Sequence, residues 1–197
     1  MKLRLTTILI LILAFYGTTK AQTDSTEEFL LGKNIYKPNA NWLTIGQGAS
    51  YNVKLNTVET NTMLAFSFHI KQHHFRIGYH TSSDKFFTEK SLQRLIDYYV
   101  TYGIRKETIH YNMALFCGFS YAYGSFYDHA ALINNHTEKY YKGFTQPGLF
   151  GIAEFTYKIL YDIGIGTSLY ISCNTKYQVI GLQIHFYLSG AYKSTIE

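Results

Sequence analysis

The sequence predicts an all-β protein, an eight-stranded antiparallel up-and-down transmembrane β-barrel. Three observations support this fold class: an export signal at the N-terminus, eight segments of alternating apolar and polar residues, and polar faces rich in glycine, serine and tyrosine. With 17% aromatic and 16% charged residues, the chain is unlike a disordered tail. Because it has only two cysteines and two prolines, it is neither a disulfide scaffold nor a proline-rich linker.

Residues 1–21 have the features of a cleaved signal peptide. Lys2 and Arg4 precede a run of nine apolar residues, and small side chains at Thr19 and Ala21 stand where signal peptidase reads the chain. We therefore expect cleavage after Ala21. Nine apolar residues are too few for a membrane-spanning helix, which needs about 20.

Removal of the signal peptide leaves an almost neutral chain. Lys2, Arg4 and Lys20 are three of the 18 basic residues, so 15 basic residues remain against 13 acidic ones. No nucleic-acid partner is expected, because proteins that bind nucleic acid present a strongly basic surface.

From residue 42 onward, apolar and polar residues alternate with the period of a β-strand, whose successive side chains point to opposite faces. In residues 161–173, for example, Ile163, Ile165 and Leu169 share one face and glycine and serine the other. The alternation predicts eight strands, at residues 42–53, 62–71, 74–82, 93–104, 108–123, 149–159, 161–173 and 179–192.

The segments that flank the predicted barrel, residues 42–192, are short. Residues 22–41 are polar and are expected to form a periplasmic leader with a turn at Tyr36-Lys37-Pro38. Residues 193–197 are expected to form a C-terminal tail.

The composition of the polar face predicts which side of the sheet is the interior. A strand face in water is usually rich in lysine, glutamate and threonine, whereas here it carries glycine, serine and tyrosine. Glycine beside tyrosine suits a narrow enclosed lumen and weakens an exposed strand. We therefore expect the apolar face, which includes Ile163, Ile165, Leu169 and Leu182, to contact lipid.

The connections between the predicted strands alternate in length. Short turns are expected near residues 71–73, 105–107 and 159–161, and longer loops at residues 54–61, 83–92 and 124–146, with a modest connection at 174–177. Outer-membrane barrels have short periplasmic turns and longer extracellular loops, so both termini are expected in the periplasm.

These features resemble the small eight-stranded outer-membrane β-barrel proteins of Gram-negative bacteria. The export signal, the eight amphipathic strands and the last strand, with Ile184, Phe186, Leu188 and Tyr192 leading to a terminal aromatic, carry the resemblance. It implies an outer-membrane location, contact with outer-membrane lipid, and insertion by the barrel-assembly machinery. It implies architecture and location, and it leaves the activity open.

The predicted lumen contains few charges, and the signs balance. The inward charged residues are expected to be Lys71, Arg76, Asp97, Glu154, Lys158 and Asp162, joined by His185 in one polar network. Lys158 and Asp162 flank a turn and are expected to face each other, because a buried charge needs a partner. Since eight strands enclose a space that side chains just fill, an open pore is not expected.

No metal or cofactor is predicted. His69, His74, His80, His110 and His185 are expected to point inward, but their spacing matches no zinc motif. Cys117 and Cys173 are expected to face outward on strands separated by one other strand, too far apart for a disulfide.

Three hypotheses for function follow. The first is a structural or surface-interaction barrel without catalysis, whose loop at residues 124–146 meets an unknown partner or folds over the barrel mouth. The second is a lipid-modifying enzyme of the deacylase or acyltransferase type, with His80 as base and Ser82 as nucleophile. The third is an exported soluble barrel that binds a small apolar ligand.

Overall fold

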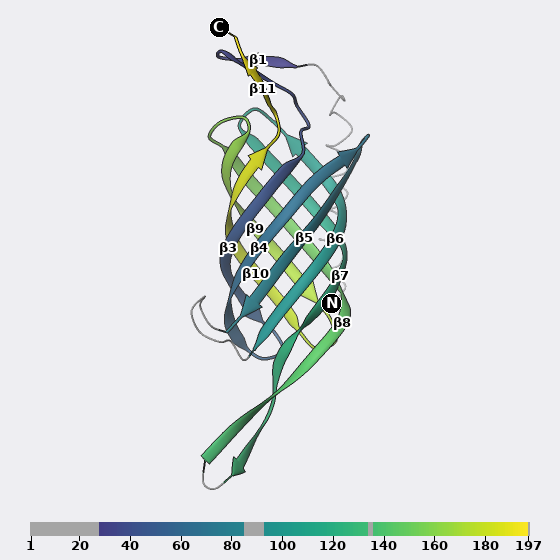
Figure 1. Ribbon diagram of the computed structural model, residues 1–197, viewed down its shortest axis with the longest axis vertical. Coiled ribbons are helices and arrows are strands. Elements are labelled where there is room, and N and C mark those ends of the chain that lie inside the picture. The colour runs from purple at the N-terminus through teal and green to yellow at the C-terminus, as the bar shows by residue number, and fades with distance from the viewer. Residues whose placement is uncertain (1–27, 85–92, 134–135, 197) are drawn as a thin grey trace, which may run out of the picture.

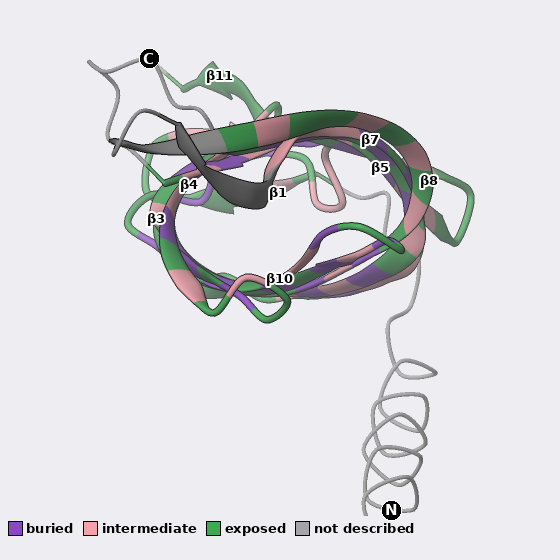
Figure 2. Cartoon of the chain, turned by 90° about the horizontal axis from the view of Figure 1, so that it is seen from below, coloured by how far each residue is buried: buried purple, intermediate pink, exposed green. Residues whose placement is uncertain are grey.

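The structure is a computed structural model that describes residues 28–84, 93–133 and 136–196. The predicted signal peptide and the start of the predicted leader lie outside the described residues. Eight strands form a closed antiparallel barrel in which the last strand pairs with the first (Figures 1 and 2). The strands are β3 (Trp42–Asn52), β4 (Thr57–Ile70), β5 (His73–Ser83), β6 (Arg94–Glu107), β7 (Tyr111–Ile133), β8 (His136–Lys158), β9 (Ile163–Cys173) and β10 (Gln178–Ser189).

The polarity of the barrel is inverted relative to a soluble protein. The exposed fractions of Ile163, Leu169, Ile184 and Phe186 are 39%, 56%, 64% and 59%, so these side chains face away from the centre. Their neighbours along the strands, such as His185, are buried inside. This arrangement confirms the predicted transmembrane β-barrel and contradicts a soluble barrel with an apolar interior. Because the barrel is closed, the N–H and C=O groups of each strand find hydrogen-bond partners on the neighbouring strands. Lipid could not supply these partners.

No helix in the described residues is long and apolar enough to cross a membrane. Cys117 and Cys173 are free thiols on β7 and β9, which are separated by β8, as predicted.

Two predicted loops are wrong. Residues 54–61 are not a long loop, because β4 begins at Thr57 and a tight turn at residues 53–56 precedes it. Residues 124–146 are not a loop over the mouth, because β7 and β8 continue as a hairpin that pairs through Ile133 and His136. In both places the strand ladder extends beyond the apolar alternation that marked the predicted strand ends.

The flanking segments are more ordered than predicted. β1 (Phe29–Leu31), β2 (Asn34–Tyr36) and β11 (Tyr192–Thr195) form a small three-stranded sheet at the end of the barrel where the short turns lie (Figure 1). The predicted leader and tail therefore meet in one sheet. Tyr192 lies in that sheet and not in the barrel, so the predicted aromatic end of the last barrel strand is wrong, and β10 ends at Ser189.

Candidate functional site: the filled lumen, its two mouths and the projecting hairpin

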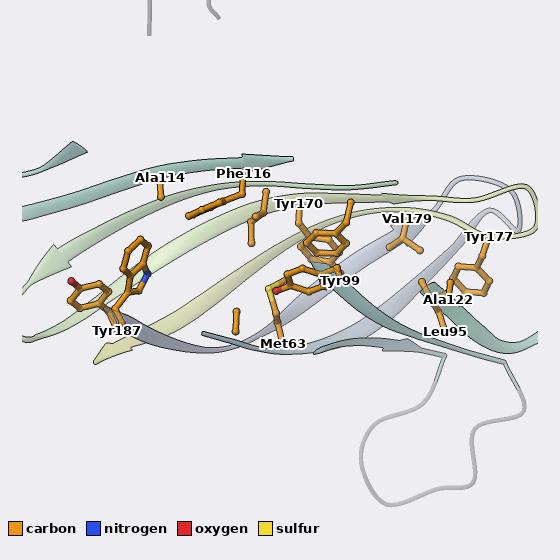
Figure 3. Packing of buried hydrophobic residues seen from close by; sticks show 14 residues of the cluster. Met63, Leu95, Tyr99, Ala114, Phe116, Ala122, Tyr170, Tyr177, Val179 and Tyr187 are labelled. Carbon is orange, nitrogen blue, oxygen red and sulfur yellow. The ribbon is translucent and has the colours of Figure 1, made fainter. Parts of the chain in front are cut away.

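An aromatic stack fills the middle of the lumen. The rings of Tyr99 and Phe150 lie 4.0 Å apart and nearly parallel, and Phe150 and Tyr170 continue the stack at 5.9 Å. Figure 3 shows Tyr99 and Tyr170 beside Met63 in this part of the barrel. Tyr99 lies over Gly78, where a Cβ atom would come within 2.3 Å of the ring. The glycine and tyrosine of the inner face therefore fit together, and larger apolar side chains complete the filling.

A polar network lies beside this stack. Arg76 and Glu154 form a fully buried ion pair, and Arg76 Nε also donates to Ser67 Oγ at 2.7 Å. The Arg76 guanidinium lies 4.4 Å from the ring centre of Phe116. His185 is held by Ser168 Oγ at 2.6 Å and Thr156 Oγ1 at 2.9 Å. The network thus connects strands from opposite sides of the barrel.

His80 and Ser82, the candidate catalytic pair, are completely buried and bind different carboxylates. His80 Nδ1 lies 3.3 Å from Asp97 Oδ2, which also accepts a hydrogen bond from Ser172 Oγ at 2.6 Å. Ser82 Oγ donates to Glu59 Oε2 at 2.5 Å. Each side chain is therefore held by a carboxylate on the inner side of the barrel wall, where lipid cannot reach it.

Glu59 organises the mouth from which the β7–β8 hairpin projects. Its Oε1 atom accepts hydrogen bonds from Asn52 Nδ2 at 3.1 Å and Gln93 Nε2 at 2.8 Å, and also from the Tyr177 hydroxyl. Burial, together with the charge of Glu59, raises the pKa of the Tyr177 phenol above its ordinary value, so the phenol stays a neutral donor. Uncharged hydrogen-bond donors from several strands and a loop thereby hold the Glu59 carboxylate at this mouth.

At the opposite mouth, ion pairs between side chains and the end of the leader cover the opening. Arg105 lies 3.0 Å from Glu107, which is also paired with Lys158. Glu107 Oε2 accepts a hydrogen bond from the backbone N–H of Asn39 at 3.0 Å, and Arg105 Nη1 donates to the carbonyl of Ala40 at 3.1 Å. The end of the leader is therefore bound across the mouth.

The small sheet packs on the same end of the barrel. Tyr36 lies 5.3 Å from the ring of Tyr161, and Phe29 meets Tyr161 edge-on at 4.8 Å. Lys158 Nζ lies 3.7 Å above the Tyr161 ring. Tyr161 is buried between the barrel and the sheet, although it alternates in phase with the outward-facing Ile163 and Ile165.

The structure brings most of the predicted lumen residues inside. Arg76, Asp97, Glu154, Lys158 and His185 are all buried.

Two predicted members lie elsewhere. Lys71 is exposed in the turn between β4 and β5, with a left-handed φ of 55°, because the strand has already ended there. Asp162 is half-buried in the turn after β8, and Lys158 pairs with Glu107 rather than with Asp162. His110 is also exposed in a turn, contrary to its predicted inward position. The described residues contain no group of His, Cys, Asp and Glu side chains that could hold a metal.

Sequence reasoning missed several lumen residues. Glu59, Arg105 and Glu107 were assigned to connections, although each lies in a strand and points inward. Alternation gives a signal for Glu59, because Thr57, Glu59, Asn61 and Met63 continue one face of β4. Trp42, Phe116 and Phe150 were missed as filling side chains because the inner face was expected to be polar throughout.

Among the described residues, the hairpin is the largest feature outside the barrel. β7 pairs with β6 as far as Ser125, and β8 begins to pair with β9 at Leu149. Past these points the described parts of β7 and β8 pair with each other, and Figure 1 shows the ribbon projecting from the end opposite the C-terminus. The eight residues of β7 beyond Ser125 span roughly 27 Å at about 3.4 Å per residue. The base is fixed by Phe144, which stacks on Tyr177 at 5.9 Å.

Neither a family model nor a curated protein matches the chain. Among solved structures, it is similar to Neisserial surface protein A, with 9% identity, a TM-score of 0.57, and coverage of 76% of this chain and 96% of that one. It is also similar to Ail, the attachment invasion locus protein of Yersinia pestis, with 13% identity, a TM-score of 0.51, and coverage of 78% and 98%. At these identities the likeness concerns the fold, and it confirms the predicted resemblance to small outer-membrane barrels at that level.

Proposed function

We propose that this chain is an integral outer-membrane barrel that displays the β7–β8 hairpin outside the cell as an interaction surface. The observation that carries the proposal is the combination of a closed, filled barrel with one hairpin that continues roughly 27 Å beyond the wall. A barrel that served only as an anchor has no need of such a ribbon. Segments that project from a rigid scaffold often carry binding functions.

The filled lumen supports a role other than solute transport. The Tyr99–Phe150–Tyr170 stack occupies the middle, and the Arg76–Glu154 pair lies beside it. An eight-stranded interior is just wide enough for such side chains. A partner would therefore be bound by the outer surface of the molecule and not by its lumen.

The enzyme hypothesis has weaker support. A nucleophile needs a base within hydrogen-bonding distance and access to its substrate. Ser82 is bound to Glu59, His80 is paired with Asp97, and both side chains are fully buried. The proposal therefore assigns these four residues to the stability of the wall.

The orientation is tested by inserting an epitope between Ile133 and His136, the last residues that pair in the hairpin. We expect an antibody to label intact cells that produce this variant. A matched variant with the same epitope after Lys71, in a turn at the opposite end, should be labelled only after the outer membrane is permeabilised. Labelling of the Lys71 epitope on intact cells, or recovery of the protein in periplasmic fluid without detergent, would refute the proposed location.

The role of the hairpin is tested by replacing residues 126–142 with an Asn-Gly turn, which joins the paired residues Ser125 and Gly143. The barrel should still insert and show heat-modifiable gel mobility, because its pairing from Tyr111 to Ser125 is retained. A strain that lacks the chromosomal gene is then complemented with the full or the shortened chain. If the shortened chain restores every phenotype that the full chain restores, the barrel alone is functional and the interaction role is wrong.

A further inference from the structure

A groove of about 680 Å³ lies on the outward wall of the barrel across β3 to β7. Apolar side chains line it, including Phe66, Ile77, Val100 and Phe119, which are aligned on neighbouring strands. All four belong to the lipid-facing surface. The volume lies within the range of about 300–1,000 Å³ that ligand pockets occupy.

The side of the groove toward the hairpin end carries tyrosines. Tyr79, Tyr98 and Tyr121 are aligned on β5, β6 and β7 and line the groove. The rings of Tyr79 and Tyr98 lie 5.6 Å apart, and those of Tyr98 and Tyr123 lie 6.1 Å apart. Amphipathic tyrosine rings prefer the boundary between hydrocarbon and headgroups. The tyrosines therefore mark where a lipid chain in the groove would meet its headgroup.

A cation follows beyond the tyrosines. Arg94 is exposed and occupies the same face of β6 as Tyr98, four residues nearer the hairpin end, or roughly 13 Å along the strand. The register places Arg94 opposite Ser83 on β5 and Ser125 on β7. A guanidinium suits a phosphate, which accepts hydrogen bonds from its N–H groups.

The arrangement is not repeated around the barrel. Where the described strands form the closed barrel, the outward basic side chains both lie on β6, with Arg94 at one end and Lys106 at the other. The outward residues of β9 and β10 include Ile165, Leu169 and Leu182, and no lysine or arginine. An anionic headgroup would therefore be attracted to the β5–β7 wall more strongly than to the opposite one.

From this order of apolar groove, tyrosine row and flanked arginine, we propose that the β5–β7 wall is a specific site for a lipid with a phosphate-bearing anionic headgroup. An acyl chain lies in the groove beside Ile77 and Val100, and the phosphate lies at Arg94. The proposal rests on membrane insertion of the barrel. It does not depend on what the hairpin binds.

The test uses the full mature chain in a non-ionic detergent, with native mass spectrometry to follow adducts of phosphatidylglycerol and phosphatidylcholine. The half-saturating concentration of phosphatidylglycerol should be lower than that of phosphatidylcholine. Arg94→Gln should raise the phosphatidylglycerol value about fivefold, as expected for one cation near a lipid surface. It should raise the phosphatidylcholine value less, because the choline cation offsets the charge of that lipid's phosphate. Lys106→Gln, the matched control on the same strand, should change neither value.

A second pair of variants tests the groove. Ile77→Trp fills it and should weaken binding of both lipids, whereas Ile165→Trp, on the opposite wall at a similar exposure, should weaken neither. All variants must retain heat-modifiable mobility, and Leu64→Trp replaces Ile77→Trp if that chain does not fold. Inorganic phosphate should not displace the lipid.

Three results would overturn the site: equal effects of Arg94→Gln and Lys106→Gln, equal effects of the two tryptophans, or displacement by phosphate alone. Any of these, together with labelling of the hairpin on intact cells, would remove the lipid site and leave the proposed function standing.

Discussion

On the outward face, the loss of stability caused by a single substitution distinguishes a lipid-facing position from one that is buried or lies at the rim of the barrel. Leu169 lies on the outward face near the middle of β9, and its strand partners are Ala153 and Leu182. An arginine there should lower the free energy of unfolding by about 2–4 kcal/mol, because the residue lies near the bilayer centre. Equilibrium unfolding by urea in lipid vesicles measures this loss.

The matched control for depth is Val58→Arg. Val58 is 73% exposed and is the second residue of β4, at the hairpin end of the barrel. A charge near the interface costs about 0–1 kcal/mol. Equal losses for Leu169→Arg and Val58→Arg would contradict the assignment of depth.

The Arg76–Glu154 pair allows a second prediction at the scale of single residues. Glu154→Gln leaves the Arg76 guanidinium buried without its counter-charge, which should cost about 3–5 kcal/mol. Replacing both partners, with Arg76→Met and Glu154→Gln together, should recover a large part of that loss. A double-mutant cycle from the same unfolding measurement checks it. Losses that simply add would show that the two side chains do not act as a pair.

At the scale of elements, the small sheet should behave as a separable cover on the barrel end. Tyr36→Ala removes the ring that packs on Tyr161 and should release β1 and β2 while the barrel stays closed. Trypsin cleavage after Lys33 should then accelerate about tenfold or more, because local opening controls such cleavage. The gel mobility of the unheated barrel should not change.

A matched substitution in the sheet controls for general loosening. Tyr192 is 47% exposed, so Tyr192→Ala removes a ring from the same sheet with less loss of buried contact. If cleavage after Lys33 is equally slow in the wild type and in Tyr36→Ala, the packing on Tyr161 does not hold the leader.

The elements also show which parts of the fold are readable from sequence. Alternation locates all eight barrel strands, because one face of each meets lipid and its apolar residues stand out. It fails for residues 124–146, since strands that leave the membrane no longer need an apolar face and lose the pattern. The same reason hides the start of β4, where Thr57 to Asn61 are strand residues without apolar alternation.

The lumen is only partly readable for a different physical reason. Alternation gives the inward direction of Arg76, Asp97 and Glu154, because direction is a property of one strand. It cannot give their partners, which depend on register and on the way the barrel closes. The expected Lys158–Asp162 contact is therefore replaced by a Lys158–Glu107 pair between β8 and β6, strands that are not neighbours.

For the whole molecule, the central claim is that lipid touches the apolar face and side chains fill the interior. Nitroxide labels placed one at a time at positions 163–172 of β9, with the protein in lipid vesicles, test it most directly. Labels at 163, 165, 169 and 171 should collide freely with dissolved oxygen, which concentrates in lipid, and those at 164, 166, 168 and 170 should be shielded. Loss of this period of two, or greater access of a water-soluble nickel complex at 165 and 169, would contradict the account.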